Sequence, residues 1–267
     1  MHIVVCVKQV PNPEAAFSMF RVDEQAKAVI PASGLQMVMS PFDEQAVEAA
    51  LRIRDAGGEV RITVLTLGPG SARAVLKHGL AMGADDGVML DDAAFQEGDA
   101  YSTARVLAAA IGKLGDCDLV LTGRQAADWD AGMVGCGLAE LLQLPVVTFA
   151  RDIAVVDGTV RVERVVENGC DVVEAPLPAV VTVSNELGAP RAPTLRETMR
   201  AARKPVATWA AADLGLAAQD VGRAGARRVL ERLFVPPKRG ACELVDGATP
   251  EEQGANLAQR LMDAKLI

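Results

Sequence analysis

Short apolar runs alternate with segments of helical periodicity over the first 150 residues. Residues 3–7, 60–65, 88–90, 119–121 and 146–149 have the length and composition of buried strands. Between these runs, apolar residues recur three or four positions apart, as on one face of a helix. Strands separated by helices favour right-handed crossovers and a parallel sheet. The pattern therefore predicts an α/β fold with a doubly wound, mainly parallel sheet.

Local signals place the ends of several helices. Ser40 suits an N-cap, Pro41 suits the first helical position, and Asp43 suits the positive end of the helix dipole. A second helix is expected over residues 72–80, with Gly83 as its C-terminal cap. Further helices are expected around residues 106–114 and from the Gly123 loop to about residue 142.

The pattern changes after residue 150. Strand-like segments at 153–156, 160–166 and 172–174 are separated by Asp157-Gly158 and Asn168-Gly169, which predict hairpins in an antiparallel region at about 151–176. Residues 178–183 then predict a strand that returns to the main sheet. We expect one nucleotide-binding domain over residues 1–204, which includes a loop at about 184–200. Residues 205–267 form a C-terminal extension that ends in an amphipathic helix at about 250–265.

Composition narrows the class of protein. Hydrophobic residues make up 50% but aromatic residues only 3%, which suits parallel strands buried by Ala-rich helices. A net charge of -8 argues against a nucleic-acid partner, and five scattered Cys indicate reduced thiols. Two His offer little for a metal site. Without an apolar run of membrane-spanning length or a leader before the first strand, we expect a cytoplasmic protein or a mitochondrial matrix protein.

The strongest candidate site is the glycine-bearing turn at residues 123–134. It follows a strand and enters a helix, so free backbone N–H groups and the helix dipole would bind a phosphate there. Ligands of parallel sheets bind beyond the carboxyl ends of the strands, where residues 6–8, 40–43 and 67–69 should converge with this turn. Alternatively, Gly132, Gly135 and Gly137 only permit tight turns and close helix packing. Walker and GxGxxG motifs are not present in the sequence.

No residue has the context of a catalytic group. Asp128 and Asp130 suit helix capping or a ribose contact better than acid–base chemistry, and Cys6 suits a buried strand position. In contrast, residues 184–201 form a polar, Pro-restricted segment that presents Leu195 beside Arg196, Arg200 and Arg203. An apolar anchor ringed by charge is typical of a docking site. We expect a carrier or subunit without bond chemistry of its own.

The chain resembles the beta subunit of an electron-transfer flavoprotein over nearly its whole length. The motifs that carry the resemblance occur in the family's order at residues 7–11 (VKQVP), 40–48 (SPFDEQAVE), 81–85 (AMGAD), 121–126 (LTGRQA) and 185–195. The resemblance implies a fold like that of adenine-nucleotide alpha hydrolases and a heterodimer whose alpha subunit holds the redox FAD. It also implies that residues 205–267 pack on the alpha subunit, and that electrons pass from an acyl-CoA-type dehydrogenase to a quinone reductase or similar acceptor.

In most members of the family the beta subunit binds structural AMP, whereas an electron-bifurcating branch binds a second FAD. Phe42 and the bulky Trp129 favour AMP here, while Val134 and the tail after Pro236 favour FAD; we expect AMP. The residues expected at the nucleotide are Cys6, Ser40, Pro41, Phe42, Asp43, Leu67, Gly123, Arg124, Gln125, Ala126, Ala127, Asp128, Trp129, Asp130, Ala131, Gly132, Met133 and Val134.

By the same resemblance, Leu195 is the anchor for the dehydrogenase, with Arg191, Arg196 and Arg200 around it. Gly188 to Arg191 departs from the family's usual Asn-Glu-Pro-Arg. Two other classes remain as alternatives. A nucleotide-sensing protein of the universal-stress type would lack the Leu195 loop, and an ATP-using ligase would need a phosphate loop early in the chain.

Overall fold

The computed structural model of the chain describes residues 1–237 and 242–267. It divides into two units. The first comprises Met1–Arg21 with Val29–Glu231, and the second comprises Val22–Ala28 with Arg232–Ile267. The first unit contains the central sheet and all the residues expected at the nucleotide and docking sites.

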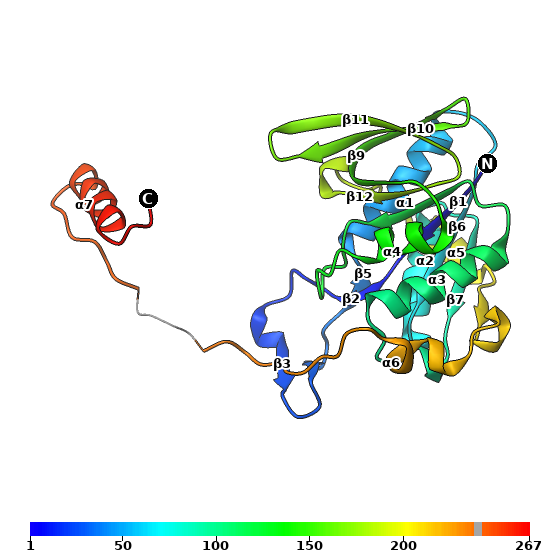
Figure 1. Ribbon diagram of the computed structural model, residues 1–267, viewed down its shortest axis with the longest axis horizontal. Coiled ribbons are helices and arrows are strands. Elements are labelled where there is room, and N and C mark those ends of the chain that lie inside the picture. The colour runs from blue at the N-terminus through cyan, green and yellow to red at the C-terminus, as the bar shows by residue number, and fades with distance from the viewer. Residues whose placement is uncertain (238–241) are drawn as a thin grey trace. The chain divides into compact units, whose positions relative to one another are not determined.

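Within the described residues, a nine-stranded sheet has the order β11-β10-β9-β12-β8-β1-β6-β7-β13 (Figure 1). The seven strands from β9 to β13 in this order run parallel, and β10 and β11 are antiparallel. The strands are β1 (His2–Cys6), β6 (Arg61–Leu67), β7 (Asp86–Leu90), β8 (Leu119–Gly123), β9 (Val146–Val156), β10 (Thr159–Val166), β11 (Gly169–Pro176), β12 (Ala179–Val183) and β13 (Ala207–Trp209).

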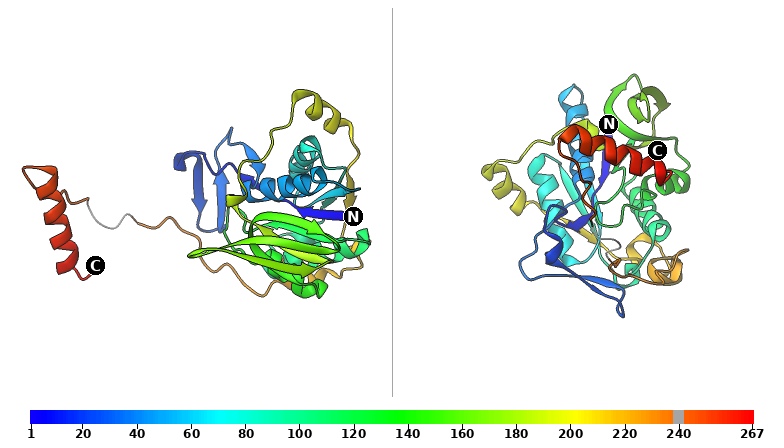
Figure 2. Two further views of the ribbon diagram at one scale, coloured as in Figure 1. Left: turned by 90° about the horizontal axis from the view of Figure 1, so that it is seen from above. Right: turned by 90° about the vertical axis from the view of Figure 1, so that its left-hand side faces the viewer.

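Helices cover both faces of the parallel strands, as the predicted doubly wound fold requires (Figure 2). Alternate residues of each strand face opposite sides: Val5 packs with one layer, and Val4 packs with the other. The first layer contains α1 (Pro41–Asp55), α2 (Arg73–Met82) and α5 (Leu195–Arg203); the second contains α3 (Ala100–Leu114) and α4 (Val134–Leu142).

The predicted antiparallel region is confirmed, but one predicted strand break is wrong. β9 runs without interruption through residues 150–152, from the parallel sheet into the antiparallel hairpins. Phe149 has φ 61°, and the β9–β12 register shifts beside it, so the strand bends at a bulge instead of ending. The Asp157-Gly158 turn has positive φ at both residues, as a type I′ hairpin turn requires.

The segment between β1 and α1 contains structure that its polar sequence did not predict. β2 (Gln9–Pro11) pairs with β5 (Met37–Met39), and β3 (Phe20–Asp23) pairs with β4 (Ala28–Pro31). These strands have only three or four residues each, and most of those residues are at least partly exposed, so none gives the sustained apolar pattern that identifies a strand in a sequence.

The first unit also extends beyond the expected limit at residue 204. β13 pairs with β7, and Val221 is buried against the α3 layer, so residues 205–231 belong to the main unit. In the second unit, α7 (Pro250–Asp263) begins at the N-cap Thr249, whose side chain accepts a hydrogen bond from Glu252 N. Among the described residues, no helix combines the length and apolar composition of a membrane span.

Candidate functional site

The order of the strands reverses at β1. From β1 the chain first adds β6 and β7 on one side and then returns to add β8 on the other side. In open parallel sheets, ligands bind at such a reversal, in the crevice beyond the carboxyl ends of the strands. Here that place, which we call the crevice, lies between Cys6 at the end of β1 and Gly123 at the end of β8, where the candidate site was expected.

Asp43 joins the ends of these two strands. One oxygen of its carboxylate accepts a hydrogen bond from the Lys8 backbone N–H (2.8 Å), and the other accepts one from the Gly123 N–H (3.1 Å). The side chain is buried at the first turn of α1, and only 7% of the residue is exposed. Burial raises the pKa of Asp43 to about 7, although the two N–H donors act in the opposite direction. Asp43 is therefore a structural link across the crevice.

Glycine is required at position 123 because the first turn of α1 packs closely against it. A Cβ at this position would lie 2.5 Å from the Asp43 carboxylate and 2.7 Å from the Phe42 Cβ. α1 can therefore bring its first turn against the end of β8 only because residue 123 has no side chain. The Ser40 hydroxyl, at the N-cap position, lies 3.4 Å from the Ala127 N–H and joins the same turn to the following loop.

An ion pair crosses the mouth of the crevice. Lys8 Nζ lies 2.6 Å and 2.8 Å from the two carboxylate oxygens of Asp128. Asp130 has φ 48° and accepts a hydrogen bond from the Gln125 side chain (2.9 Å). Both acidic side chains are thus engaged within the loop and with Lys8; neither caps α4, whose N-cap residue is Met133, so the capping interpretation is wrong.

Arg124 lies between two aromatic rings. Its guanidinium is 5.0 Å from the centre of the Phe42 ring and 5.8 Å from that of Phe149. Nη1 donates a hydrogen bond to the Ser184 hydroxyl (3.2 Å), while Nε is buried without an acceptor within the described part of the chain. A buried donor without an acceptor is unfavourable, so a ligand oxygen at Nε would satisfy it.

The helix that follows the loop has a free N-terminus. α4 begins at Val134, and Met133 at the N-cap position has no side-chain hydrogen bond to the helix. The first N–H groups of such a helix have no intrahelical acceptor and attract anions. The packing interpretation also applies, because a Cβ at Gly135 would lie 2.5 Å from Thr182 Cγ2 and one at Gly137 would lie 3.1 Å from Ala104 Cβ. The uncapped helix end and the Arg124 Nε therefore both fit a nucleotide phosphate.

The remaining expected residues differ in accessibility. Cys6 is buried, and burial raises the pKa of its thiol, as expected for a packed strand residue. Leu67 and Val134 are partly buried against the α3 and α4 layer. Trp129 is 56% exposed and Met133 is 50% exposed, so neither side chain is packed in the core. The structure brings Phe149 and Ser184 to Arg124 as well, and sequence analysis missed both, because they belong to segments distant along the chain.

The expected docking residues lie on and before α5. Leu195 is the first residue of this helix and is 77% exposed; with Arg196, Met199, Arg200 and Arg203 it lines one surface hollow. Thr194 and Glu197 form a capping box at its start. Arg191 has a different role, because its guanidinium lies 2.7 Å from Glu48 and 2.8 Å from Asp55 on α1.

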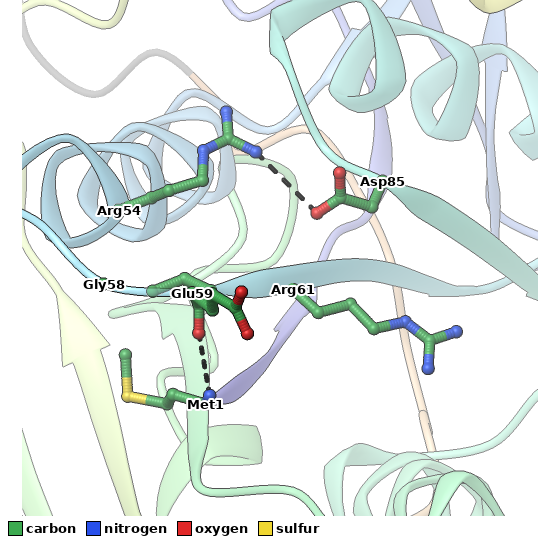
Figure 3. A pocket seen from close by; sticks show the side chains of 7 residues that line it. Met1, Arg54, Gly58, Glu59, Arg61 and Asp85 are labelled. Atoms are coloured by element: carbon green, nitrogen blue, oxygen red, sulfur yellow. Dashed lines mark hydrogen bonds and ion pairs between the residues drawn. The ribbon is translucent and has the colours of Figure 1, made fainter.

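A second hollow lies at the opposite end of the parallel strands. Met1, Gly58, Glu59, Arg61 and Asp85 contribute to it from the starts of β1, β6 and β7 (Figure 3). Its polar groups are paired locally: the N-terminal ammonium donates to Glu59 O (2.8 Å), and Arg54 lies 3.7 Å from Asp85. Because sheet ligands bind at the carboxyl ends of parallel strands, the crevice at Gly123 is the better candidate.

Comparison with known proteins agrees with this arrangement. The family model described as "Electron transfer flavoprotein domain" matches residues 28–214. The chain is 36% identical over its full length to the "Caffeyl-CoA reductase-Etf complex subunit CarD" of Acetobacterium woodii, which is also covered completely. It is 37% identical to "Electron transfer flavoprotein subunit beta" of Megasphaera elsdenii, with complete coverage of both chains. It is 38% identical to "Protein FixA" of Azorhizobium caulinodans, over 90% of this chain and 86% of the relative.

The Acetobacterium woodii and Megasphaera elsdenii proteins match the whole length of the chain, and the matches confirm the resemblance drawn from the five sequence motifs. The chain belongs to the electron transfer flavoprotein family, among its beta subunits.

Proposed function

We propose that this chain pairs with an alpha subunit that carries FAD, and that the heterodimer relays electrons between an acyl-CoA-type dehydrogenase and a quinone reductase or similar acceptor. The dehydrogenase docks on the exposed face of α5, with Leu195 as its apolar anchor. The relative named as a subunit of a caffeyl-CoA reductase complex supports a partner that acts on acyl-CoA thioesters.

The beta subunit itself holds an adenine nucleotide at the β1/β8 crevice. The observation that carries this proposal is that one loop joins Arg124, whose buried Nε has no acceptor within the described residues, to the free N-terminus of α4. Ser40 and Asp43 fix the neighbouring first turn of α1, and Lys8 supplies a cation at the mouth of the crevice. These groups bind and orient the nucleotide and require no bond chemistry from the chain.

Two observations favour FAD over the AMP expected from the sequence. Trp129 is 56% exposed, so its ring is not packed within the loop, and its bulk alone does not argue for AMP. In addition, the backbone N–H groups of Arg227 and Arg228 donate to Asp99, and Arg228 Nη1 lies 3.5 Å from Met133 Sδ, so this part of the main unit brings a cation beside the loop. That charge suits the two phosphates of FAD better than the single phosphate of AMP. When bound, a flavin supplies one- and two-electron redox chemistry.

A nucleotide count tests the proposal. We expect the purified heterodimer to release two FAD per alpha–beta pair on denaturation. One FAD and one AMP would support AMP at this site instead, and one FAD without another adenine nucleotide would contradict the site altogether. Arg124→Gln should lower the content of the second nucleotide and leave one FAD. The control Arg161→Gln, exposed on β10, should leave both in place.

A further inference from the structure

The chain between β12 and α5 reaches the docking helix without a strand or α-helix of its own. Of residues 184–194, only Asn185–Leu187 form a single 3-10 turn, and Gly188 follows with φ 101°. Such a segment has many accessible conformations unless side chains hold it. Its contacts with α1 therefore decide where Leu195 lies.

Glu48 is the centre of these contacts. It lies on α1, and only 5% of the residue is exposed. Arg191 Nε (2.7 Å) and the Arg191 backbone N–H (3.1 Å) both donate to Glu48 Oε2, and Arg191 Nη2 donates to Glu48 Oε1 (3.2 Å). Both the backbone and the side chain of Arg191 are thus fixed by one buried carboxylate.

Arg52 extends the same link to the other end of the segment. Its Nε donates to Glu48 (3.0 Å), and its Nη1 donates to the Leu187 carbonyl oxygen (3.0 Å). Burial alone would raise the pKa of Glu48, but hydrogen bonds from Arg191 and Arg52 outweigh it and lower the pKa, so the carboxylate is charged at neutral pH.

The far end of α5 has a separate attachment. The ammonium group of Lys77 on α2 donates to the carbonyl oxygens of Ala201, Ala202 and Lys204, and Ala201 is buried beneath the helix. The C-terminal turn is therefore fixed by α2, whereas the N-terminal turn with Leu195 depends on the segment that Glu48 holds.

We propose that Glu48 is a positioning residue for partner docking: through Arg191 and Arg52 it fixes the segment that presents Leu195. This inference rests on the proposed docking at Leu195. A buried ion pair is weak evidence for stability, because desolvation offsets much of the attraction. Its contribution here is to preorganise an exposed binding element, so that less conformational entropy is lost when the partner binds.

The test compares heterodimers with Glu48→Gln, Arg191→Gln and both changes. Electron transfer is measured from an acyl-CoA dehydrogenase reduced with butyryl-CoA. We expect the apparent KM for the heterodimer to rise about two- to thirtyfold, with kcat unchanged. The double variant should raise KM by less than the product of the two single effects, because both substitutions remove the Glu48–Arg191 link. Arg61→Gln, which breaks an exposed 2.8 Å ion pair with Asp86, is the matched control and should leave KM unchanged.

Leu195→Ala, measured in parallel, separates the two proposals. If Leu195→Ala raises KM and Glu48→Gln does not, the role of Glu48 is wrong and the docking site stands. If neither variant changes KM, the proposed docking site is wrong. Amide hydrogen exchange gives a second reading that needs no dehydrogenase. Glu48→Gln should speed exchange over residues 185–199, and unchanged exchange there would overturn the role of Glu48.

Discussion

The carboxylate of Asp43 accepts a hydrogen bond from the Gly123 N–H at 3.1 Å, and through this contact α1 touches the end of β8. The same carboxylate holds the Lys8 N–H at the end of β1. One side chain thus fixes the two loops on either side of the strand reversal, and the geometry of the crevice depends on it.

Gly123→Ala should damage this contact. The added Cβ would lie 2.5 Å from Asp43 Oδ1 and 2.9 Å from the Phe42 carbonyl carbon, so backbone must shift, and we expect a loss of about 1–3 kcal/mol in the free energy of unfolding. The control is Gly112→Ala in α3, where a Cβ meets nothing within 4 Å. That change should stabilise the protein by about 0.5–1 kcal/mol. Equal effects of the two substitutions in denaturant unfolding would contradict the close approach at Gly123.

Asp43 should make stability depend on pH. Its pKa of about 7 in the folded chain exceeds the ordinary value of 3.8, so the folded state binds more protons between these values. Relative to Asp43→Asn, which does not titrate, the wild type should lose stability as pH rises from about 4 to 7 and change little above pH 7. Thermal unfolding of both proteins from pH 5 to 9 measures the difference. A stability difference between wild type and variant that stays constant from pH 5 to 7 would contradict the raised pKa, because a carboxyl group with an ordinary or lowered pKa is ionised in both states over that range.

Leu195→Ala should impair docking without affecting the fold. Truncation of a docking anchor costs about 2 kcal/mol, or roughly a thirtyfold loss in electron transfer from the dehydrogenase at limiting concentrations. Because the residue is 77% exposed, the melting temperature and flavin content should not change. Leu187→Ala provides the contrast: this residue is 6% exposed, and its truncation should cost about 2–5 kcal/mol of stability. A comparable loss of stability in Leu195→Ala would place Leu195 in a core.

Thr194→Ala should loosen the first turn of α5. The hydroxyl of Thr194 accepts the Glu197 N–H, and the Glu197 carboxylate accepts the Thr194 N–H, so the substitution removes half of the capping box, at a cost of about 1 kcal/mol. Hydrogen exchange of the amides at 195–198 should become faster, whereas Thr194→Ser should retain protection. If the alanine variant exchanges like wild type, contacts other than the cap hold this turn.

The parallel sheet was predictable because its strands are continuous apolar runs buried on both faces. Residues 3–7 and 119–121 were identified in this way, and they became β1 and β8. The short strands β2, β5 and β13 were not predicted, because most of their residues are partly exposed and leave no apolar periodicity. The limit at residue 204 was wrong for the same reason, since β13 joins the main sheet through its backbone.

The part of the candidate site that lies in one continuous segment was predictable from the sequence. The contacts between segments far apart in the sequence were not. The loop at 123–134 was recognisable from its glycines and its place between strand and helix. The contacts of Arg124 with Phe149 and Ser184, and of Arg191 with Glu48, depend on tertiary packing between segments far apart in sequence. Arg191 illustrates the difference. Its place close to Leu195 in the sequence suggested that its charge contacts a docked partner, whereas the structure places its guanidinium against Glu48 and Asp55 on α1.

The outer face of α5 offers a way to change which dehydrogenase donates electrons to the protein. Leu195, Met199 and the neighbouring arginines face solvent, while the helix is anchored through the buried Ala201 and, at its C-terminal end, through the carbonyl oxygens held by Lys77. Substitutions on the outer face therefore leave the core intact. If this face selects the partner, grafting it from one beta subunit to another would redirect electrons to a different dehydrogenase, with the nucleotide site and the fold left as they are.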